Sequence, residues 1–321
     1  MKKLLSLLCV LSLSAALLVT GVCAAEGSVE LTAGTQAEGP VLVWGTVQEI
    51  GEGRIRLENS NDQDPYREIV LVVGPETAIL DAVTGAPRIF ADLQENETLY
   101  AYVGPAMTMS LPPVASAQVV LCGIPADFGA PTYAEVQAVR GRWDGGVDAY
   151  VTGDVILHLS ADTELTAYRT KNIVGLDDIR PGVRLLSWYD IVTLSLPAQA
   201  TPAKVLVFPY GYEGYVTVSE GTVSLDGEPV GEARTAEGQT MVPVRALAEA
   251  LDCTVTWQAD NNAVSVVRGE EVLYRFVIGS GTVERDGGET VVATFAENGV
   301  TFMPLEALAW LHALKVETPW P

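Results

Sequence analysis

Two different internal repeats run through this chain of 321 residues, and they restrict it to a fold built from tandem modules. The first repeat is marked by residues 108–112, Thr-Met-Ser-Leu-Pro, and by residues 193–197, Thr-Leu-Ser-Leu-Pro. A strand-like apolar run follows each copy. Because self-similarity at a fixed period indicates a repeated structural unit, we expect two β modules, over residues 41–126 and 132–210.

Short alternating runs, separated by glycine, proline and aspartate, fill both modules. Residues 54–57 and 68–73 are examples, and no stretch before residue 240 has a helical period. Alternation between turn residues is typical of β-strands. Five or six short strands in each module predict a small closed barrel, because closure removes the exposed edges of a sheet. The type of barrel stays open.

The C-terminal third carries the second repeat, in two units that each begin with an Asp-Gly pair and reach a proline followed by a helical pattern. Glycine supplies the positive φ of a tight hairpin turn, and proline is tolerated where a helix begins. Apolar residues then recur at helical spacing. We expect strand–turn–strand–helix–strand, twice. The residues expected to support this structure are Asp226, Gly227, Pro243, Leu247, Trp257, Gly287, Pro304 and Leu308.

At these residues the sequence resembles the copper amine oxidase N-terminal-like domain family, whose members are also called stalk domains. The family pattern joins an Asp-Gly hairpin, a Val-Pro-x-Arg-Ala helix and a strand that ends in tryptophan. Here these parts are residues 226–227, residues 242–251 and Trp257. The resemblance covers about residues 215–321 and implies an antiparallel sheet curled around a helix. The expected fold class is therefore mainly β, with two tandem barrel-like modules and an α+β C-terminal domain.

The two units depart from the family pattern and from each other. The glycine that usually ends the helix is Asp252 in the first unit and Ala313 in the second. The arginine of the first helix, Arg245, is Glu306 in the second. The resemblance therefore implies no matched pair of functional sites.

Amine oxidase chemistry is not expected in this chain. It requires three histidine ligands for copper and a tyrosine, within an Asn-Tyr motif, that becomes a quinone cofactor. The chain has two histidines, His158 and His312, and no Asn-Tyr pair. No Gly-x-Ser-x-Gly motif is present, and neither Cys122 nor Cys253 has a histidine nearby in sequence. We predict a non-catalytic protein without cofactor or copper, in which the two cysteines are unpaired because they lie in different modules.

The first residues predict export. Lys2 and Lys3 precede an apolar run that ends in the small-x-small sequence of residues 22–24. We expect a signal peptide over residues 1–24 and a flexible leader over residues 25–40. The alternatives are an uncleaved anchor and a lipoprotein modified on Cys23. No later segment is long and apolar enough to span a bilayer, so we expect a secreted, extracytoplasmic protein that associates with the cell wall.

The charge narrows the class of partner. The chain has 19 Lys and Arg against 41 Asp and Glu, a net charge of −22, and loss of Lys2 and Lys3 would make it −24. Phosphate backbones and anionic membranes repel such a chain, which excludes nucleic acid as the expected partner. The hypothesis is a docking or scaffold module that binds wall polymer or another envelope protein. The alternatives are a glycan-binding or glycan-cleaving accessory protein and an acidic extracellular metal buffer.

Two surfaces are candidates for ligand contact. The hydroxyls of the first repeat either bind a sugar or peptide or satisfy their own loop backbone. The tyrosines between the second β module and the C-terminal domain either stack on a glycan or pack between the domains. These candidate residues are Thr108, Ser110, Thr193, Ser195, Tyr210 and Tyr212.

Overall fold

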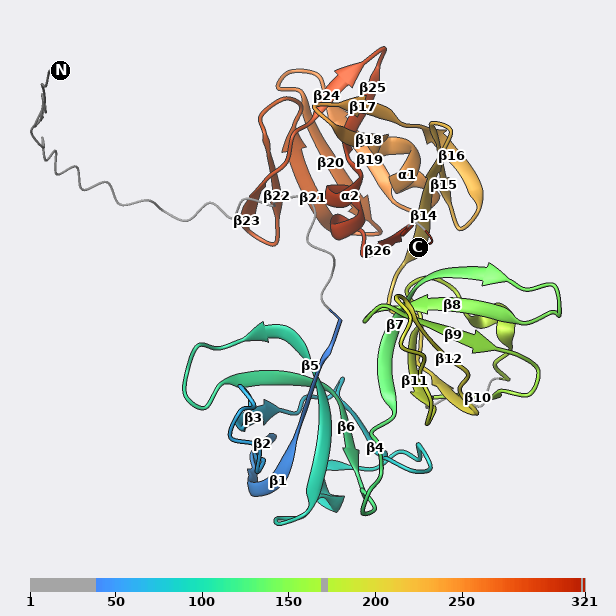
Figure 1. Ribbon diagram of the computed structural model, residues 1–321. Coiled ribbons are helices and arrows are strands. Elements are labelled where there is room, and N and C mark those ends of the chain that lie inside the picture. The colour runs from blue at the N-terminus through green and yellow to red at the C-terminus, as the bar shows by residue number, and fades with distance from the viewer. Residues whose placement is uncertain (1–38, 169–172, 319, 321) are drawn as a thin grey trace, which may run out of the picture.

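The structure is a computed structural model that describes residues 39–168, 173–318 and 320. The predicted signal peptide, and all but the end of the predicted leader, lie outside these residues. Figure 1 shows three parts in chain order, coloured blue to teal, green to yellow and orange to red. The expectation of a mainly β chain with an α+β C-terminal domain is confirmed.

The first part is a closed five-strand barrel. The strand order is β3-β2-β1-β5-β6, and β3 also pairs with β6, which closes the barrel. A short strand, β4, continues the sheet beside β6. The elements are β1 (Val41–Gly51), β2 (Arg54–Glu58), β3 (Glu68–Val72), β4 (Ala78–Asp81), a 3-10 turn η1 (Phe90–Asp92), β5 (Thr98–Met107) and β6 (Val114–Cys122).

The second part repeats these elements but forms a half-barrel. Its strand order is β10-β13-β11-β7-β8-β9-β12. The strand equivalent to β6 is broken at residues 201–203 into β12 and β13, where Pro202 cannot donate a backbone hydrogen bond. The elements are β7 (Thr132–Gly141), β8 (Val147–Val151), β9 (Val155–Leu159), β10 (Glu164–Ala167), η2 (Leu176–Asp178), β11 (Arg184–Trp188), β12 (Ala198–Ala200) and β13 (Lys204–Val207).

The two β modules share a buried cluster and form one packed body. The cluster includes Leu121 of β6 and Leu206 of β13, which occupy equivalent positions in the repeat. The rings of Tyr102 and Tyr133 lie 5.6 Å apart across the contact. Trp188 Nε1 donates a 2.7 Å hydrogen bond to the carbonyl of Ala82. Each module therefore covers the same apolar face of the other, a contact that the strand pattern did not predict.

The C-terminal domain contains two helices and three sheets. The sheet orders are β16-β15-β14-β26, β17-β18-β25-β24 and β19-β20-β21-β22-β23. The first unit contains β14 (Gly214–Ser219), β15 (Thr222–Leu225), β16 (Glu228–Glu232), β17 (Arg234–Ala236), β18 (Gln239–Pro243), α1 (Val244–Ala250) and β19 (Thr254–Gln258). The remaining elements are β20 (Ala263–Arg268), β21 (Glu271–Val277), β22 (Thr282–Arg285), β23 (Gly288–Val291), β24 (Phe295–Glu297), β25 (Val300–Pro304), α2 (Leu305–Leu311) and β26 (Leu314–Val316).

The turns and helices of the predicted repeat are present in both units. At the first hairpin, Asp226 and Gly227 have φ values of +48° and +88°, and the second hairpin has the same left-handed pair. Strands β18 and β25 pair antiparallel with Val242 opposite Met303. These two residues are equivalent in the repeat, so a local two-fold axis relates the units at this point. Each proline ends its strand and immediately precedes the helix.

Both helices bury the leucine predicted to face the sheets. Leu247 of α1 and Leu308 of α2 are 0% exposed and belong to one core cluster. That cluster contains residues of the C-terminal domain alone. The domain therefore has a core of its own, separate from the cluster that joins the two β modules.

Candidate functional site

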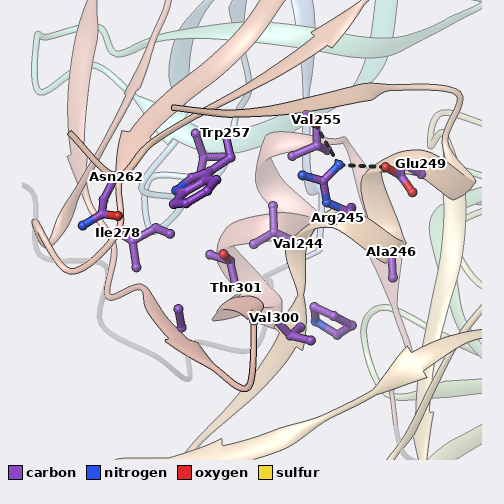
Figure 2. A pocket seen from close by; sticks show the side chains of 14 residues that line it. Val244, Arg245, Ala246, Glu249, Val255, Trp257, Asn262, Ile278, Val300 and Thr301 are labelled. Carbon is purple, nitrogen blue, oxygen red and sulfur yellow. Dashed lines mark hydrogen bonds and ion pairs between the residues drawn. The ribbon is translucent and has the colours of Figure 1, made fainter. Parts of the chain in front are cut away.

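A groove of about 530 Å³ runs beside α1 (Figure 2). The pairing of β25 with β18 creates it, because β18 leads directly into α1. This pairing brings the β24–β25 hairpin of the second unit next to the helix of the first. The β19–β20 hairpin provides the opposite wall. The groove is therefore a product of the two-fold arrangement, and neither unit forms it alone.

The indole of Trp257 forms part of one wall of the groove. Trp257 is on the same face of β19 as Val255, because side chains alternate along a strand. Val255 is buried in the core, whereas Trp257 lies beyond the edge of the core and is 54% exposed. An apolar floor is provided by Val244 and Val264, which are both buried.

One end of the groove is closed by an ion pair on the helix. Arg245 Nη1 donates hydrogen bonds to Glu249 Oε1 at 3.1 Å and to the carbonyl oxygen of Val255 at 2.8 Å, as Figure 2 shows. Both side chains of the pair are about half exposed, so the pair adds only about 0.3–0.5 kcal/mol to stability. Its effect is to fix the guanidinium at this end of the groove and to offset its charge.

Two further polar side chains line the groove without a partner in the part of the chain that the structure describes. They are the amide of Asn262, in the β19–β20 turn, and the hydroxyl of Thr301, in β25. A stacking ring beside free hydrogen-bonding groups suits a ligand with apolar faces and polar edges. Glu249 is the one carboxylate among the lining residues, so the groove lacks the carboxylate pair that glycoside hydrolysis uses.

The second unit has a different surface at the equivalent place. The residue equivalent to Arg245 is Glu306, and the residue equivalent to Glu249 is Trp310. There the guanidinium of Arg285 lies 5.0 Å from the centre of the Trp310 ring and donates to the carbonyl of Trp310. The departures between the two units thus coincide with a groove beside α1 and with the contact between Arg285 and Trp310 on α2.

The hydroxyls of the first repeat are bonded within their own loops. In the loop between β5 and β6, the hydroxyl oxygens of Thr108 and Ser110 lie 2.6 Å apart, and Ser110 donates to the carbonyl of Pro112 at 2.9 Å. Thr193 and Ser195 make the same pair of contacts in the second module, at 2.6 and 2.8 Å. What these loops present to solvent is their intervening apolar side chains.

The two candidate tyrosines lie between the second β module and the C-terminal domain. Tyr212 donates a 3.0 Å hydrogen bond to Glu135 Oε2 of β7, and Lys315 of β26 forms a 2.7 Å ion pair with the same carboxylate. Tyr210 donates to the carbonyl of Pro181, and Arg180 lies 3.9 Å from the centre of its ring. Both rings are half-buried by these contacts.

His158 is held on β9, as the strand pattern predicted. Its Nδ1 lies 2.7 Å from Asp148 Oδ1, and its Nε2 lies 3.0 Å from Gln199 Oε1. Both ring nitrogens are therefore engaged. Among the described residues, no group of three or more His, Cys, Asp and Glu side chains is arranged to hold a metal ion.

His312 is buried in the C-terminal core against Tyr274, whose hydroxyl lies 2.9 Å from Nε2. Its Nδ1 is buried and has no hydrogen-bond partner among the described residues. Burial, together with the nearby charges of Arg268 and Arg285, lowers the pKa of His312 to about 4. The imidazole is thus neutral in the folded domain at pH 7.

The stability of the chain is expected to fall as the pH is lowered from about 7 to about 4. In this window the unfolded chain binds a proton at His312, whose ordinary pKa is 6.5, and the folded chain does not. The neutral state of His312 makes its full contribution to the free energy of unfolding above pH 6.5. This contribution, up to about 3 kcal/mol, is lost as the pH falls to about 4. The variant His312→Leu introduces the residue found at the equivalent position directly after α1, Leu251, and should flatten this part of a curve of unfolding free energy against pH. An unchanged slope would contradict the assignment.

Cys122 and Cys253 are free thiols in the structure and lie in different modules. Both are buried. Burial is also the main cause that raises the pKa of the Cys122 thiol to about 11. A thiol in this state is not a nucleophile at neutral pH.

Comparison with known proteins supports the resemblance at the C-terminus. The sequence model of the family described as the Copper amine oxidase N-terminal domain matches residues 217–319. In copper amine oxidases this stalk-type domain is not the catalytic part. A search of curated proteins found no match. Among the residues that the structure describes, no helix is long and apolar enough to cross a bilayer.

Proposed function

We propose that the protein is a non-catalytic binding module of the cell envelope, and that the groove beside α1 binds a neutral wall polysaccharide. The observation that carries this proposal is the exposed indole of Trp257 above an apolar floor, with the free polar groups of Asn262 and Thr301 in the same groove. The exported, extracytoplasmic location rests on the pattern of residues 1–24.

Sugar rings match this arrangement chemically. A pyranose has faces of C–H groups, which pack on an indole, and a rim of hydroxyls that need hydrogen-bond partners. Tryptophan is enriched at contact surfaces that are apolar on one side and hydrated on the other, because its ring is apolar and its N–H group is polar. The amide of Asn262 both donates and accepts, as does the hydroxyl of Thr301, so both suit hydroxyl and acetamido groups.

The charge of the chain favours a neutral polymer over an anionic one. With a net charge of −22, the protein is repelled by polyphosphate and polycarboxylate chains. The one cation in the groove lining, Arg245, is paired with Glu249. We therefore expect acetamido sugars without free acid groups to bind better than teichoic-acid-like polymers. The described residues give no support to a metal buffer, because they contain no clustered ligand set.

Calorimetric titration with a soluble tetramer of N-acetylglucosamine tests the proposal. We expect binding by the natural sequence and an affinity loss of at least about tenfold in Trp257→Ala, since one anchor residue commonly contributes more than about 1.4 kcal/mol. Trp143→Ala is the matched control, because Trp143 is a fully exposed tryptophan in another module. Equal binding by the Trp257 and Trp143 variants would contradict the groove as the site.

A further inference from the structure

The two loops of the first repeat expose large aliphatic side chains to an unusual degree. Met109 and Leu111 in the β5–β6 loop are 103% and 96% exposed, and Leu194 and Leu196 in the β11–β12 loop are 104% and 88% exposed. We call residues 108–112 and 193–197 the apolar tips. An exposed leucine by itself is ordinary, but the same pair of positions is exposed in both modules.

The polar side chains of the apolar tips are turned inward. Thr108 Oγ1 accepts a hydrogen bond from the backbone N–H of Val114 at 2.8 Å, and Thr193 Oγ1 accepts one from Gln199 at 2.9 Å. The serine hydroxyls bond to the threonines and to proline carbonyls within the loop. The loops are therefore held in shape from inside, and their outer surface is aliphatic carbon.

The sequence segments that contain the apolar tips carry no charged residue in an otherwise acidic chain. No Asp, Glu, Lys or Arg occurs from residue 98 to residue 126, or from residue 191 to residue 203. The rest of the chain contains all 41 acidic residues. The sequence next to each apolar tip thus adds no repulsive charge, and the nearest acidic residue at the base of the second tip is Asp154, whose carbonyl accepts a 2.9 Å hydrogen bond from the backbone N–H of Ala198.

We propose that the apolar tips insert into the interfacial zone of a lipid bilayer, as shallow anchors that are independent of the groove. Aliphatic side chains on a projecting loop enter hydrocarbon without needing a complementary shape. Insertion is limited to the side chains, because the loop backbone has polar groups that hydrocarbon cannot satisfy. Each tip supplies two long aliphatic chains, and the burial of apolar area drives the binding.

A protein partner fits these loops less well. Specific protein interfaces contain about one hydrogen bond per 100–200 Å², and the side-chain hydroxyls of the apolar tips are already used inside the loops. Insertion of aliphatic side chains into a bilayer requires no such hydrogen bonds. The charge of the whole chain further selects a zwitterionic surface, because an anionic surface repels a protein of net charge −22.

Flotation with phosphatidylcholine vesicles tests this inference on the chain without its first 24 residues. The fourfold variant Met109→Ser, Leu111→Ser, Leu194→Ser and Leu196→Ser should lose vesicle binding by more than about tenfold, because it removes the apolar area that drives insertion. It should stay folded, since these side chains are exposed and the inner hydroxyl bonds remain. The control is Ile89→Ser with Ile173→Ser, two exposed aliphatic residues outside the tips, and it should bind as the natural sequence does.

Vesicles with added phosphatidylglycerol provide a second readout. Binding to them should be weak at low salt and should rise as salt screens the repulsion, which acts over about 10 Å at 0.1 M. Absence of binding to phosphatidylcholine vesicles by the natural sequence would overturn the inference. So would equal binding by the fourfold variant. Loss of self-association in that variant, with no vesicle binding by either protein, would assign the apolar tips to protein contact instead.

Discussion

Replacement of Leu247 by alanine is expected to lower the free energy of unfolding of the C-terminal domain by about 2–5 kcal/mol, the usual cost of truncating a buried leucine. Leu247 is 0% exposed and lies in the one core cluster that joins both helices to the sheets. A fragment of residues 215–321 is expected to fold alone, because that cluster draws on no residue of the β modules. Chemical denaturation of the fragment measures the loss.

The control for this prediction is Asp226→Ala in the same domain. Asp226 lies in the first hairpin turn and is about half exposed, and its Oδ1 accepts a 3.0 Å hydrogen bond from the backbone N–H of Tyr215. Removal of one such bond costs about 1 kcal/mol, clearly less than the cavity left by Leu247→Ala. Equal costs for the two variants would mean that α1 does not pack on the sheets as described.

Replacement of Tyr133 by alanine is expected to cost about 3–5 kcal/mol, the range for a large aromatic side chain in a core, and to weaken both β modules together. Tyr133 is buried in the second module, and its ring contacts Tyr102 of the first module and Phe208 of its own. Hydrogen exchange in the full chain should show faster exchange in β4 and β6 as well as in β7 and β11.

Trp143→Ala serves as the control here too, because its side chain is exposed and its removal should change stability by less than about 0.5 kcal/mol. Faster exchange confined to β7 and β11 in Tyr133→Ala would show that the modules unfold separately. The shared cluster would then be a contact between two independent domains.

Features set by local chemistry could be predicted from the sequence. The Asp-Gly turns demand left-handed backbone, and both pairs adopt it. The apolar period after Pro243 and Pro304 predicts one buried helix in each unit, and Leu247 and Leu308 are buried as expected. The tandem β modules follow from alternation and repetition. For the turns and the helices the signal lies within a few residues, and for the β modules it is the recurrence of one short motif along the chain.

Features that depend on contacts between distant segments could not be predicted. The predicted module bounds place Tyr102 and Tyr133 in different β modules, but they do not indicate the surface that each ring covers. The second module is a half-barrel because the strand equivalent to β6 is broken at residues 201–203. In the sequence the one sign of this break is Pro202.

Trp257 was expected to have a structural role, because it ends a family-like strand. Trp257 is exposed because it lies on β19 beyond the last residue that the core buries. The groove around it also requires the β24–β25 hairpin, which belongs to the other unit. The Thr108 and Thr193 loops were candidates for ligand contact through hydroxyls. The structure uses those hydroxyls within the loops and exposes the apolar neighbours instead.

The central claim is that the groove beside α1 binds a neutral polysaccharide, and nuclear magnetic resonance tests it most directly. The titrant is the N-acetylglucosamine tetramer, and the observed signals are the tryptophan indole and Asn side-chain amide N–H groups. The account predicts that the signals of Trp257 and Asn262 shift together and saturate, while those of Trp143 and Trp310 stay in place. Unchanged Trp257 and Asn262 signals at millimolar tetramer, or shifts centred on Trp143, would contradict it.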